Sequence, residues 1–370
     1  MTMEADKKAR SWKRLPVAAF ALALLCILFL VFRLMPGPAV EISVSPVNSR
    51  KSNFHFVPEH WQEPMLRQLR EQENFKDLGG RDQLALFLNY CHWTHSQWPM
   101  SVPDPYPRSN AIDILADIRS GKTGGFCGQY AYVLADVLKS MGFFAVRYVE
   151  LWSDEGESHF VVEVWSDQFA KWMILDPAED VYYAFLDSGR PASALEVHAT
   201  LSNPGKIAAF SASQPRTSRG SHKMNLYANM AVSTRSDLMH LDKPPTVGDR
   251  FRTFVFYRDR RGISRTFAGR IPYSLVTDRA DDINFDCNYV LVNGRYDRKR
   301  GTITLEFASE GSMFNFFHFA FSTDEGKTWK RCGSSMELAA SARVASVWVS
   351  AVNAYGRFGQ PTRVSIQYPR

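Results

Sequence analysis

The stretch that decides the fold reads GGFCGQYAYVLADVLKSMGFFAVRYVEL over residues 124–151, followed by SHFVVEVW at 158–165 and KWMILDPAED at 171–180. From Tyr130 to Met141, apolar residues recur at intervals of three and four, which predicts an amphipathic helix that stops at Gly142. Short runs rich in β-branched and aromatic residues follow, and we expect each of them to be a strand. This order of elements indicates an α+β core.

Cys127 stands at the N-terminal end of the predicted helix, just after Gly124 and Gly125. A thiol there lies at the positive end of the helix dipole, which favours the thiolate. Backbone N–H groups of the first turn can also stabilise an oxyanion beside the sulfur, and the glycines let a substrate carbonyl approach. Cys127 is therefore a candidate nucleophile, although a single cysteine is more often a small apolar core residue.

A cysteine nucleophile needs a base and a group that orients the base. If the second and third strands form a hairpin around residues 166–169, then Trp165 lies opposite Ala170 and His159 lies opposite Asp176. Directly opposed residues have Cβ atoms about 5 Å apart, so the imidazole and the carboxylate could hydrogen-bond. The register is an assumption, because a slip of one residue would separate them. We expect Cys127, His159 and Asp176 to form a catalytic triad.

These residues resemble the transglutaminase-like superfamily, papain-like enzymes that include transglutaminases, peptide N-glycanases and bacterial cysteine proteases or amidases. The resemblance covers roughly residues 80–180, and its motif is Cys127 before a helix, His159 opening a strand and Asp176 closing the next. It implies a papain-like core in which Cys127 is the nucleophile, His159 the base and Asp176 the orienting group.

Three further residues are oxyanion or substrate-binding candidates. Family members often place an aromatic side chain upstream to help the oxyanion, and Trp93 and Trp98 both fit that description. Gln129 could contact substrate, although capping the helix or facing solvent is the more common role. The mechanism calls for no organic cofactor and no metal. Cys91 and His95 are one helical turn apart, but no second ligand pair accompanies them and a structural role is favoured.

The sequence pattern changes after Pro244 and Pro245. From there, short runs of alternating apolar and polar residues, separated by turn residues, predict an all-β sandwich. The segment VWVSAVNAYGRFGQPTRVSIQY at 347–368 resembles the last two strands of fibronectin type III or immunoglobulin-like modules. We therefore expect a transglutaminase-like catalytic domain over residues 62–245 and the sandwich over 246–370. Cys287 and Cys332 could form a disulfide in this second domain, which the sequence does not decide.

The N-terminus predicts a membrane anchor. Residues 1–14 carry five basic residues against two acidic ones, and residues 15–32 are uncharged. As a helix, that run would span roughly 27 Å, about one hydrocarbon core. We expect a cytoplasmic arm at 1–14, a transmembrane signal anchor at 15–35 and a stalk at 36–61, with a cleaved signal peptide as the alternative. The positive-inside rule places the bulk of the chain outside the cytoplasm, in the periplasm or at the cell surface.

Composition and charge fit this layout. The chain has 370 residues, of which 45% are hydrophobic and 22% charged, so two globular domains are expected. The formal charge is +6, but the basic arm and Arg33 contribute +4, which leaves +2 for residues 36–370. A part so close to neutral gives no reason to expect a nucleic-acid partner.

The sequence therefore predicts a membrane-anchored extracytoplasmic cysteine enzyme. It would cleave or transfer an acyl group at an amide or peptide bond, acting on a protein, a peptide or a small amide. No residue decides between a hydrolase and an acyltransferase. The alternative is a catalytically silent envelope scaffold or binding protein that keeps the same fold.

Overall fold

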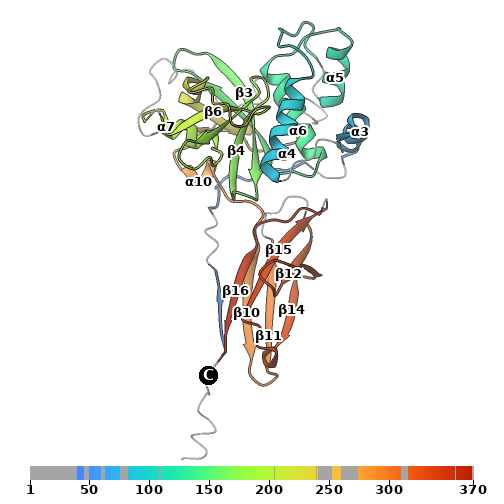
Figure 1. The fold of residues 1–370 in the computed structure, drawn as a ribbon, viewed down its shortest axis with the longest axis vertical. Helices are drawn as coiled ribbons and strands as arrows, with labels where there is room; N and C mark the ends of the chain where they lie inside the picture. The colour runs from blue at the N-terminus through green and yellow to red at the C-terminus, as the bar shows by residue number, and fades with distance from the viewer. Residues whose placement is uncertain are drawn as a thin grey trace, which may run out of the picture.

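The computed structural model describes residues 40–45, 50–59, 63–75, 82–107, 110–203, 205–238, 240, 252–259, 274–309, 316–354 and 356–368. They form a core lobe of helices and strands and a second lobe made of strands that projects from it (Figure 1). The architecture is a mixed α+β fold, as the sequence predicts.

The core lobe is built on an eight-stranded sheet with the order β6-β5-β4-β3-β2-β7-β8-β9. All neighbouring strands are antiparallel except the last pair, β8 and β9. The strands are β2 (Val146–Trp152), β3 (Ser158–Ser166), β4 (Lys171–Asp176), β5 (Val181–Phe185), β6 (Ile207–Ser211), β7 (Asn229–Ser233), β8 (Phe254–Tyr257) and β9 (Leu275–Thr277).

Helices cover both faces of this sheet. One face carries α3 (Pro64–Glu73), α4 (Gln83–His95), α5 (Ala111–Arg119) and α6 (Cys127–Ser140), which share one apolar cluster with the side chains of that face. The other face packs against α7 (Ala194–Thr200), α10 (Ala280–Ile283) and a 3-10 helix, η2 (Met224–Ala228). The sheet is therefore the middle layer of the core lobe.

Helix α6 is the most enclosed helix of the core lobe. Every residue from Gly128 to Ser140 is buried, since α3, α4 and α5 surround it and β2 and β3 lie beneath it. The sequence predicts an amphipathic helix with an exposed face, and this prediction is wrong for the polar positions. Asp136 and Lys139 are buried because they pair inside the protein.

The second lobe contains a five-stranded sheet, β1-β16-β15-β12-β13, and a three-stranded sheet, β10-β11-β14. Side chains of both sheets share one apolar cluster, which is consistent with the expected β-sandwich. The elements are β1 (Glu41–Val44), β10 (Leu291–Asp297), β11 (Thr302–Ala308), β12 (Phe316–Ser322), β13 (Lys330–Cys332), β14 (Ser335–Ala339), the 3-10 helix η3 (Ala340–Ala342), β15 (Ser346–Asn353) and β16 (Thr362–Gln367).

The boundary between the core sheet and the sandwich does not lie at residue 245, where the sequence predicts it. Strands β8 and β9 follow the expected boundary at residue 245, yet they extend the core sheet beyond β7, where Phe254 and Phe256 are fully buried. Strand β1 falls within the expected stalk, yet it pairs with β16, with Glu41 opposite Gln367. The sandwich thus begins at β10 and takes one strand from the N-terminal side. Pairing partners so far apart in the chain leave no local signal in the sequence.

Two other expectations concern cysteines and the membrane. Cys287 and Cys332 are both free, since Cys287 is buried with Trp165 and Trp172 whereas Cys332 packs against the sandwich core. The expected transmembrane segment, residues 15–35, lies outside the described residues. In the ranges described above, none of the helices combines the length and the apolar character that a membrane crossing requires.

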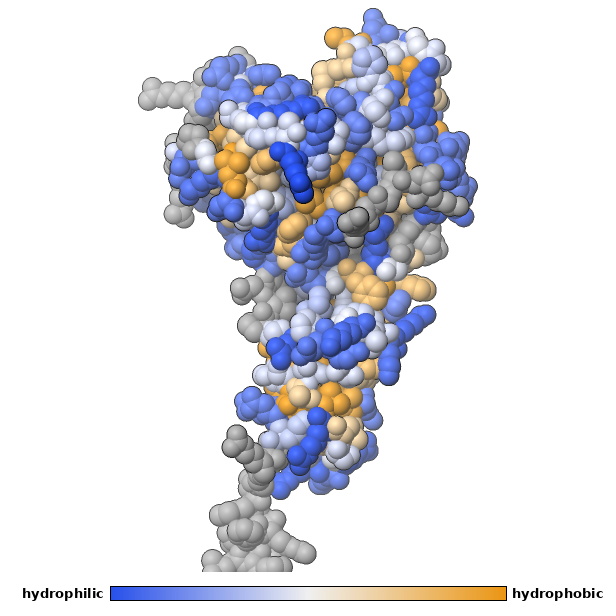
Figure 2. All heavy atoms as spheres, viewed as in Figure 1, coloured by the Kyte–Doolittle hydropathy of each residue, from blue (hydrophilic) through white to orange (hydrophobic). Residues whose placement is uncertain are grey.

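The sandwich is fastened to the core lobe at the C-terminal end of α6. The guanidinium of Arg357 donates hydrogen bonds to the Met141 carbonyl from Nε at 2.9 Å and from Nη2 at 2.7 Å, and it lies 3.6 Å from the ring centre of Phe143. Asn353 donates to the Gly142 carbonyl at 2.9 Å. A cation placed on carbonyls at a helix C-terminus is favourable. Around this narrow junction the visible surface of both lobes is mainly hydrophilic, with small apolar patches (Figure 2).

We predict that Arg357→Ala lowers the free energy of unfolding by about 2 kcal/mol, because charge-assisted hydrogen bonds to the Met141 carbonyl are lost. Denaturant unfolding of the two proteins measures this. Arg295→Ala is the matched control, since the Arg295 side chain is 71% exposed and its ion pair with Glu306 lies on the surface. Equal losses in the two variants would contradict the role of Arg357.

Candidate active site

Cys127 is the first residue of α6 and lies at the N-terminal end of that helix. The preceding residue, Phe126, has an extended backbone, and its N–H donates to Oε1 of Gln129 at 3.1 Å. This hydrogen bond fixes the backbone conformation of Phe126, the residue that precedes α6. The N–H groups of the first turn have no acceptor within the helix, so they and the helix dipole favour negative charge at the sulfur. Cys127 is partly buried and lines a cavity.

His159 connects Cys127 to Asp176. Its Nε2 lies 2.7 Å from Oδ2 of Asp176, and His159 and Cys127 line the same cavity. Burial by itself lowers the pKa of His159, but the Asp176 charge and the hydrogen bond to Asp176 outweigh it and raise the pKa to about 10. The three side chains thus have the order that a Cys-His-Asp triad requires, with the imidazole between the thiol and the carboxylate.

The hairpin that carries His159 and Asp176 has a different register from the expected one. Trp165 lies opposite Trp172 instead of Ala170, which shifts the pairing by two residues. The reason is the turn: Ala170 has a φ of 54°, a left-handed conformation typical of turns, so it stays outside β4. A shift of two keeps each side chain on its face of the sheet. His159 and Asp176 are therefore diagonal neighbours and still meet.

The C-terminal end of α4 supports both sides of the site. Nδ1 of His95 lies 3.0 Å from the carbonyl oxygen of Pro177, the residue after Asp176. The His95 ring stacks on Tyr130, which in turn stacks on Trp98 at 4.3 Å between ring centres. Nε1 of Trp98 donates to the Gly125 carbonyl at 3.3 Å, two residues before Cys127. One run of stacked rings thus joins the segment before the thiol to the segment after the carboxylate.

Of the oxyanion and substrate-binding candidates, none lines the cavity beside Cys127. Trp98 is buried under Gly125, where a Cβ atom would come within 2.7 Å of its Nε1, so this position requires glycine. Trp93 packs edge-on against Phe75. Gln129 is fully buried, so it does not face solvent, and it accepts a hydrogen bond at the helix start, which is the capping role that the sequence offered as the other common one.

A cavity of about 290 Å³ opens beside the sulfur. Cys127, Gly128, Ser158 and His159 form part of its wall, and the remaining lining side chains are Tyr106, Phe126, Tyr132, Glu150, Trp152 and Phe160. Sequence reasoning missed these six. Alternation along β2 places Glu150 and Trp152 on the same face of the sheet, next to β3, which carries His159, and this pattern in the sequence could have identified them.

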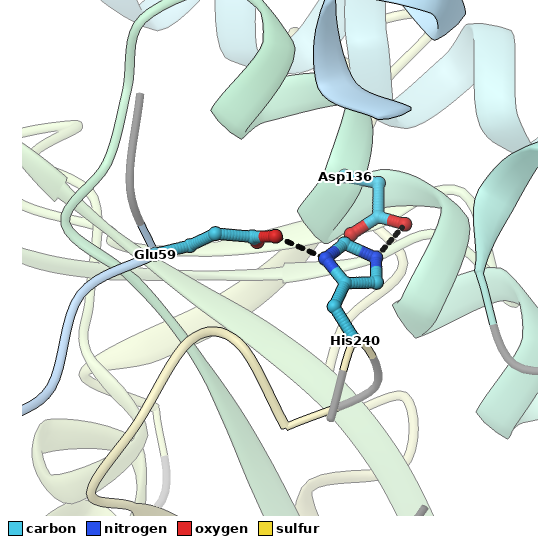
Figure 3. Close-up of side chains that lie close together, drawn as sticks. All are labelled: Glu59, Asp136 and His240. Carbon is cyan, nitrogen blue, oxygen red and sulfur yellow. Dashed lines mark hydrogen bonds and ion pairs between the residues drawn. The ribbon is translucent and has the colours of Figure 1, made fainter. Parts of the chain in front are cut away.

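A separate group of ionisable side chains has the composition of a metal site. Glu59, Asp136 and His240 bring ligand atoms within 4.8 Å of one another (Figure 3). His240 bridges the carboxylates, with Nδ1 on Glu59 and Nε2 3.1 Å from Asp136. However, the Lys139 ammonium already pairs with Glu59 and lies 2.9 Å from Oδ1 of Asp136. The ammonium of Lys139 and the imidazolium of His240 balance the negative charges of the two carboxylates. A divalent ion at this position would therefore have to displace Lys139.

The cysteine and histidines of α4 do not form a metal site either. Burial raises the pKa of the Cys91 thiol well above its usual value, and the charges of Asp180 and Asp176 add to the effect. A metal-binding cysteine must be a thiolate, so this environment opposes it. His92 pairs with Asp180 at 3.2 Å, and His95 faces the Pro177 carbonyl. The structure gives both histidines a structural role.

We predict that His240 stabilises the fold in a pH-dependent manner. Burial lowers its pKa, but the Asp136 charge and the hydrogen bonds to Asp136 and Glu59 raise it from 6.5 to about 9. Its contribution is complete below pH 6.5 and is lost as pH rises through about 9. The difference in unfolding midpoint between wild type and His240→Gln should shrink over that range. The exposed His55, as His55→Gln, is the control, and a constant difference for His240→Gln would contradict the assignment.

We also predict that His95 positions Asp176 through the Pro177 carbonyl. His95→Phe keeps a ring on Tyr130 but loses the hydrogen bond, so alkylation of Cys127 by iodoacetamide should slow by about tenfold and its pH profile should shift. His95→Asn keeps a donor and should restore most of the rate. Ser96→Ala, on the exposed side of the same turn, should change nothing. If His95→Phe altered only the unfolding temperature, His95 would have no positioning role.

The comparison with protein families agrees with this geometry. Residues 78–177 match the model of the transglutaminase-like superfamily, and Cys127, His159 and Asp176 all lie within the match. A search of curated proteins gave no match. The resemblance seen in the sequence is thus confirmed for this segment, while the catalytic roles of the three residues stay predictions. Residues 78–177 are thus similar to a transglutaminase-like core, and the sandwich and the remaining strands of the central sheet lie outside the match.

Proposed function

We propose that the protein is a cysteine enzyme that transfers or hydrolyses an acyl group at an amide or peptide bond. The observation that carries the proposal is the hydrogen bond between Asp176 and His159, with His159 and Cys127 in the wall of one cavity and the sulfur at a helix N-terminus. A transglutaminase-like core supports cysteine-dependent acyl chemistry in general.

In the proposed reaction the Cys127 thiolate attacks the carbonyl carbon of the substrate amide. The oxyanion that forms lies next to the unpaired N–H groups at the start of α6, which stabilise it. The His159 imidazolium then gives its proton to the leaving amine as the C–N bond breaks, leaving a thioester on Cys127. Asp176 keeps the imidazole oriented and stabilises its charge. Water or a second amine, deprotonated by His159, attacks the thioester and releases Cys127.

The fold is compatible with a membrane anchor before residue 40. Strand β1 begins beside the end of β16, at the tip of the sandwich far from the core lobe (Figure 1). An anchor preceding β1 would therefore hold the sandwich next to the bilayer and the core lobe away from it. The basic arm and the uncharged run support this arrangement, with both lobes outside the cytoplasm.

We predict that iodoacetamide labels Cys127 selectively and that His159→Ala reduces the labelling rate at pH 7 by roughly 10²-fold, because the thiolate loses its counter-ion. Mass spectrometry of the labelled full-length protein identifies the site. Cys332→Ala is the control, since Cys332 is the other partly exposed cysteine of the described chain and lies in the sandwich. Equal labelling of wild type and His159→Ala would contradict the proposed triad and favour a catalytically silent scaffold.

The pH profile of amide turnover tests Asp176. Because the pKa of His159 is about 10, proton transfer from His159 to the leaving amine should remain possible up to about that pH. Asp176→Asn removes the charge that raises this pKa, so the alkaline limit should move to lower pH. Turnover of an amide substrate, once one is found, should fall by roughly 10²- to 10⁴-fold. An unchanged alkaline limit in Asp176→Asn would show that Asp176 does not orient the base.

A further inference from the structure

Large apolar side chains are exposed close to the candidate nucleophile. Eight such side chains are exposed in the described ranges, and four of them fall within residues 100–126. These four are Met100, Val102, Tyr106 and Phe126, with exposed fractions between 38% and 84%. Single exposed apolar residues are normal on a protein surface, whereas several at one place are typical of a binding site. The surface next to Cys127 therefore has the composition of a recognition surface.

The loop that carries Tyr106 is held against the segment that leads to the nucleophile. The Ser101 N–H donates a hydrogen bond to the Gly125 carbonyl at 2.9 Å. The Thr123 hydroxyl donates to the carbonyl of Pro105, the residue directly before Tyr106. Because the loop is bonded at two points to this segment, Tyr106 has a defined position beside the candidate site.

Tyr106 and Phe126 form the exposed part of the wall of the cavity beside Cys127. Their rings meet edge-to-face with 6.3 Å between ring centres. A Cβ atom added at Gly128 would lie 3.6 Å from the hydroxyl oxygen of Tyr106 and 3.7 Å from Cε1 of Phe126, so both side chains reach the first turn of α6. A substrate group that enters the cavity from solvent therefore contacts these two rings next to the sulfur.

The inner part of the cavity continues the aromatic wall. Tyr132, Trp152 and Phe160 line it, and the ring centres of Tyr132 and Phe160 are 5.5 Å apart. The Phe160 ring also stacks on that of the fully buried Tyr148, with 5.6 Å between ring centres. Packing from behind thus fixes the inner rings before any ligand enters. In all, five of the lining residues are aromatic.

The size and chemistry of the wall fit one aromatic side chain. The volume of about 290 Å³ lies at the lower end of the range for ligand sites. Aromatic rings in edge-to-face or offset contact stabilise one another beyond the burial of their surface, whereas an alkyl group of the same size gains burial alone. Glu150 also lines the cavity, but it already takes part in an interaction within the protein, so no role in binding is assigned to its charge.

We propose that this cavity binds an aromatic side chain of the substrate, held by Tyr106 and Phe126 at the exposed end and by the rings behind them. The proposal rests on the proposed function in taking Cys127 as the reacting group. It gives that function a substrate class, an amide or peptide bond next to a side chain like that of phenylalanine, tyrosine or tryptophan. Tyr106 and Phe126 are then specificity-determining residues, and neither takes part in the transfer of the acyl group.

Binding can be tested without turnover, using full-length Cys127→Ala protein and three neutral compounds. N-acetyl-phenylalanine amide is aromatic, N-acetyl-cyclohexylalanine amide has an alkyl ring of similar size, and N-acetyl-alanine amide has no ring. Isothermal titration or ligand-observed NMR gives the dissociation constants. We expect the phenylalanine compound to bind at least roughly tenfold more tightly than the alanine compound, and about two- to tenfold more tightly than the cyclohexylalanine compound.

Variants of the wall identify the source of the preference. In the Cys127→Ala background, Tyr106→Ala combined with Phe126→Ala should reduce the preference for the phenylalanine over the alanine compound to less than about threefold. Tyr106→Phe keeps the ring and should retain the preference. Val102→Ala is the matched control, because Val102 belongs to the same loop, is 84% exposed and lies outside the cavity wall.

The proposal is overturned if the alanine or the cyclohexylalanine compound binds as tightly as the phenylalanine compound, if none of the three binds, or if the preference survives loss of both rings. Should the protein that lacks both rings fail to fold, the ranking of the three compounds and the single variant Tyr106→Ala still decide. Failure of the proposed function looks different. Cys127 would then resist alkylation in the wild type, while the phenylalanine compound could still bind the Cys127→Ala protein.

Discussion

The structure depends on the complete burial of helix α6. A helix enclosed on all sides must satisfy every polar side chain it carries inside the protein, since water is not available to do so. Asp136 and Lys139 meet this requirement by pairing with each other and with Glu59 and His240, which come from distant parts of the chain. The helix that carries Cys127 is thus fixed in position by electrostatic contacts as well as by packing.

Both ends of α6 are used. The N-terminal end presents the sulfur and unpaired N–H groups, whereas the C-terminal end offers carbonyls to Arg357 and Asn353 of the sandwich. The helix dipole makes the first end suitable for an anion and the second for a cation. The same element therefore positions the chemistry and fastens the second lobe. Since the sandwich holds the far end of the helix, its orientation is coupled to that of the candidate site.

The candidate triad could be predicted from the sequence because its signals are local. A cysteine before a helical pattern, and a histidine and an aspartate within one hairpin, are read directly from residue order. The register of the hairpin formed by β3 and β4 could not be predicted, because it depends on Ala170 adopting a left-handed turn conformation that alanine rarely takes. The contact between His159 and Asp176 still forms, because a shift of two residues keeps each side chain on the same face of the sheet. The pairing of β1 with β16 depends on contacts across more than 300 residues, which no local pattern encodes. The division of the sheets depends on β8 pairing with β7, which the change of sequence pattern at residue 245 does not reveal.

The aromatic residues near the site show why residue type alone was a poor guide. Trp98 was a candidate for contacting an oxyanion, yet its indole N–H donates to Gly125 and its ring stacks on Tyr130, so it acts on the backbone leading to Cys127. The rings that reach the cavity lie on α6, on two strands and in loops. A similar distinction applies to charge. Of the formal charge of +6, the first 33 residues carry +4, so the net charge of the chain says little about the surroundings of Cys127.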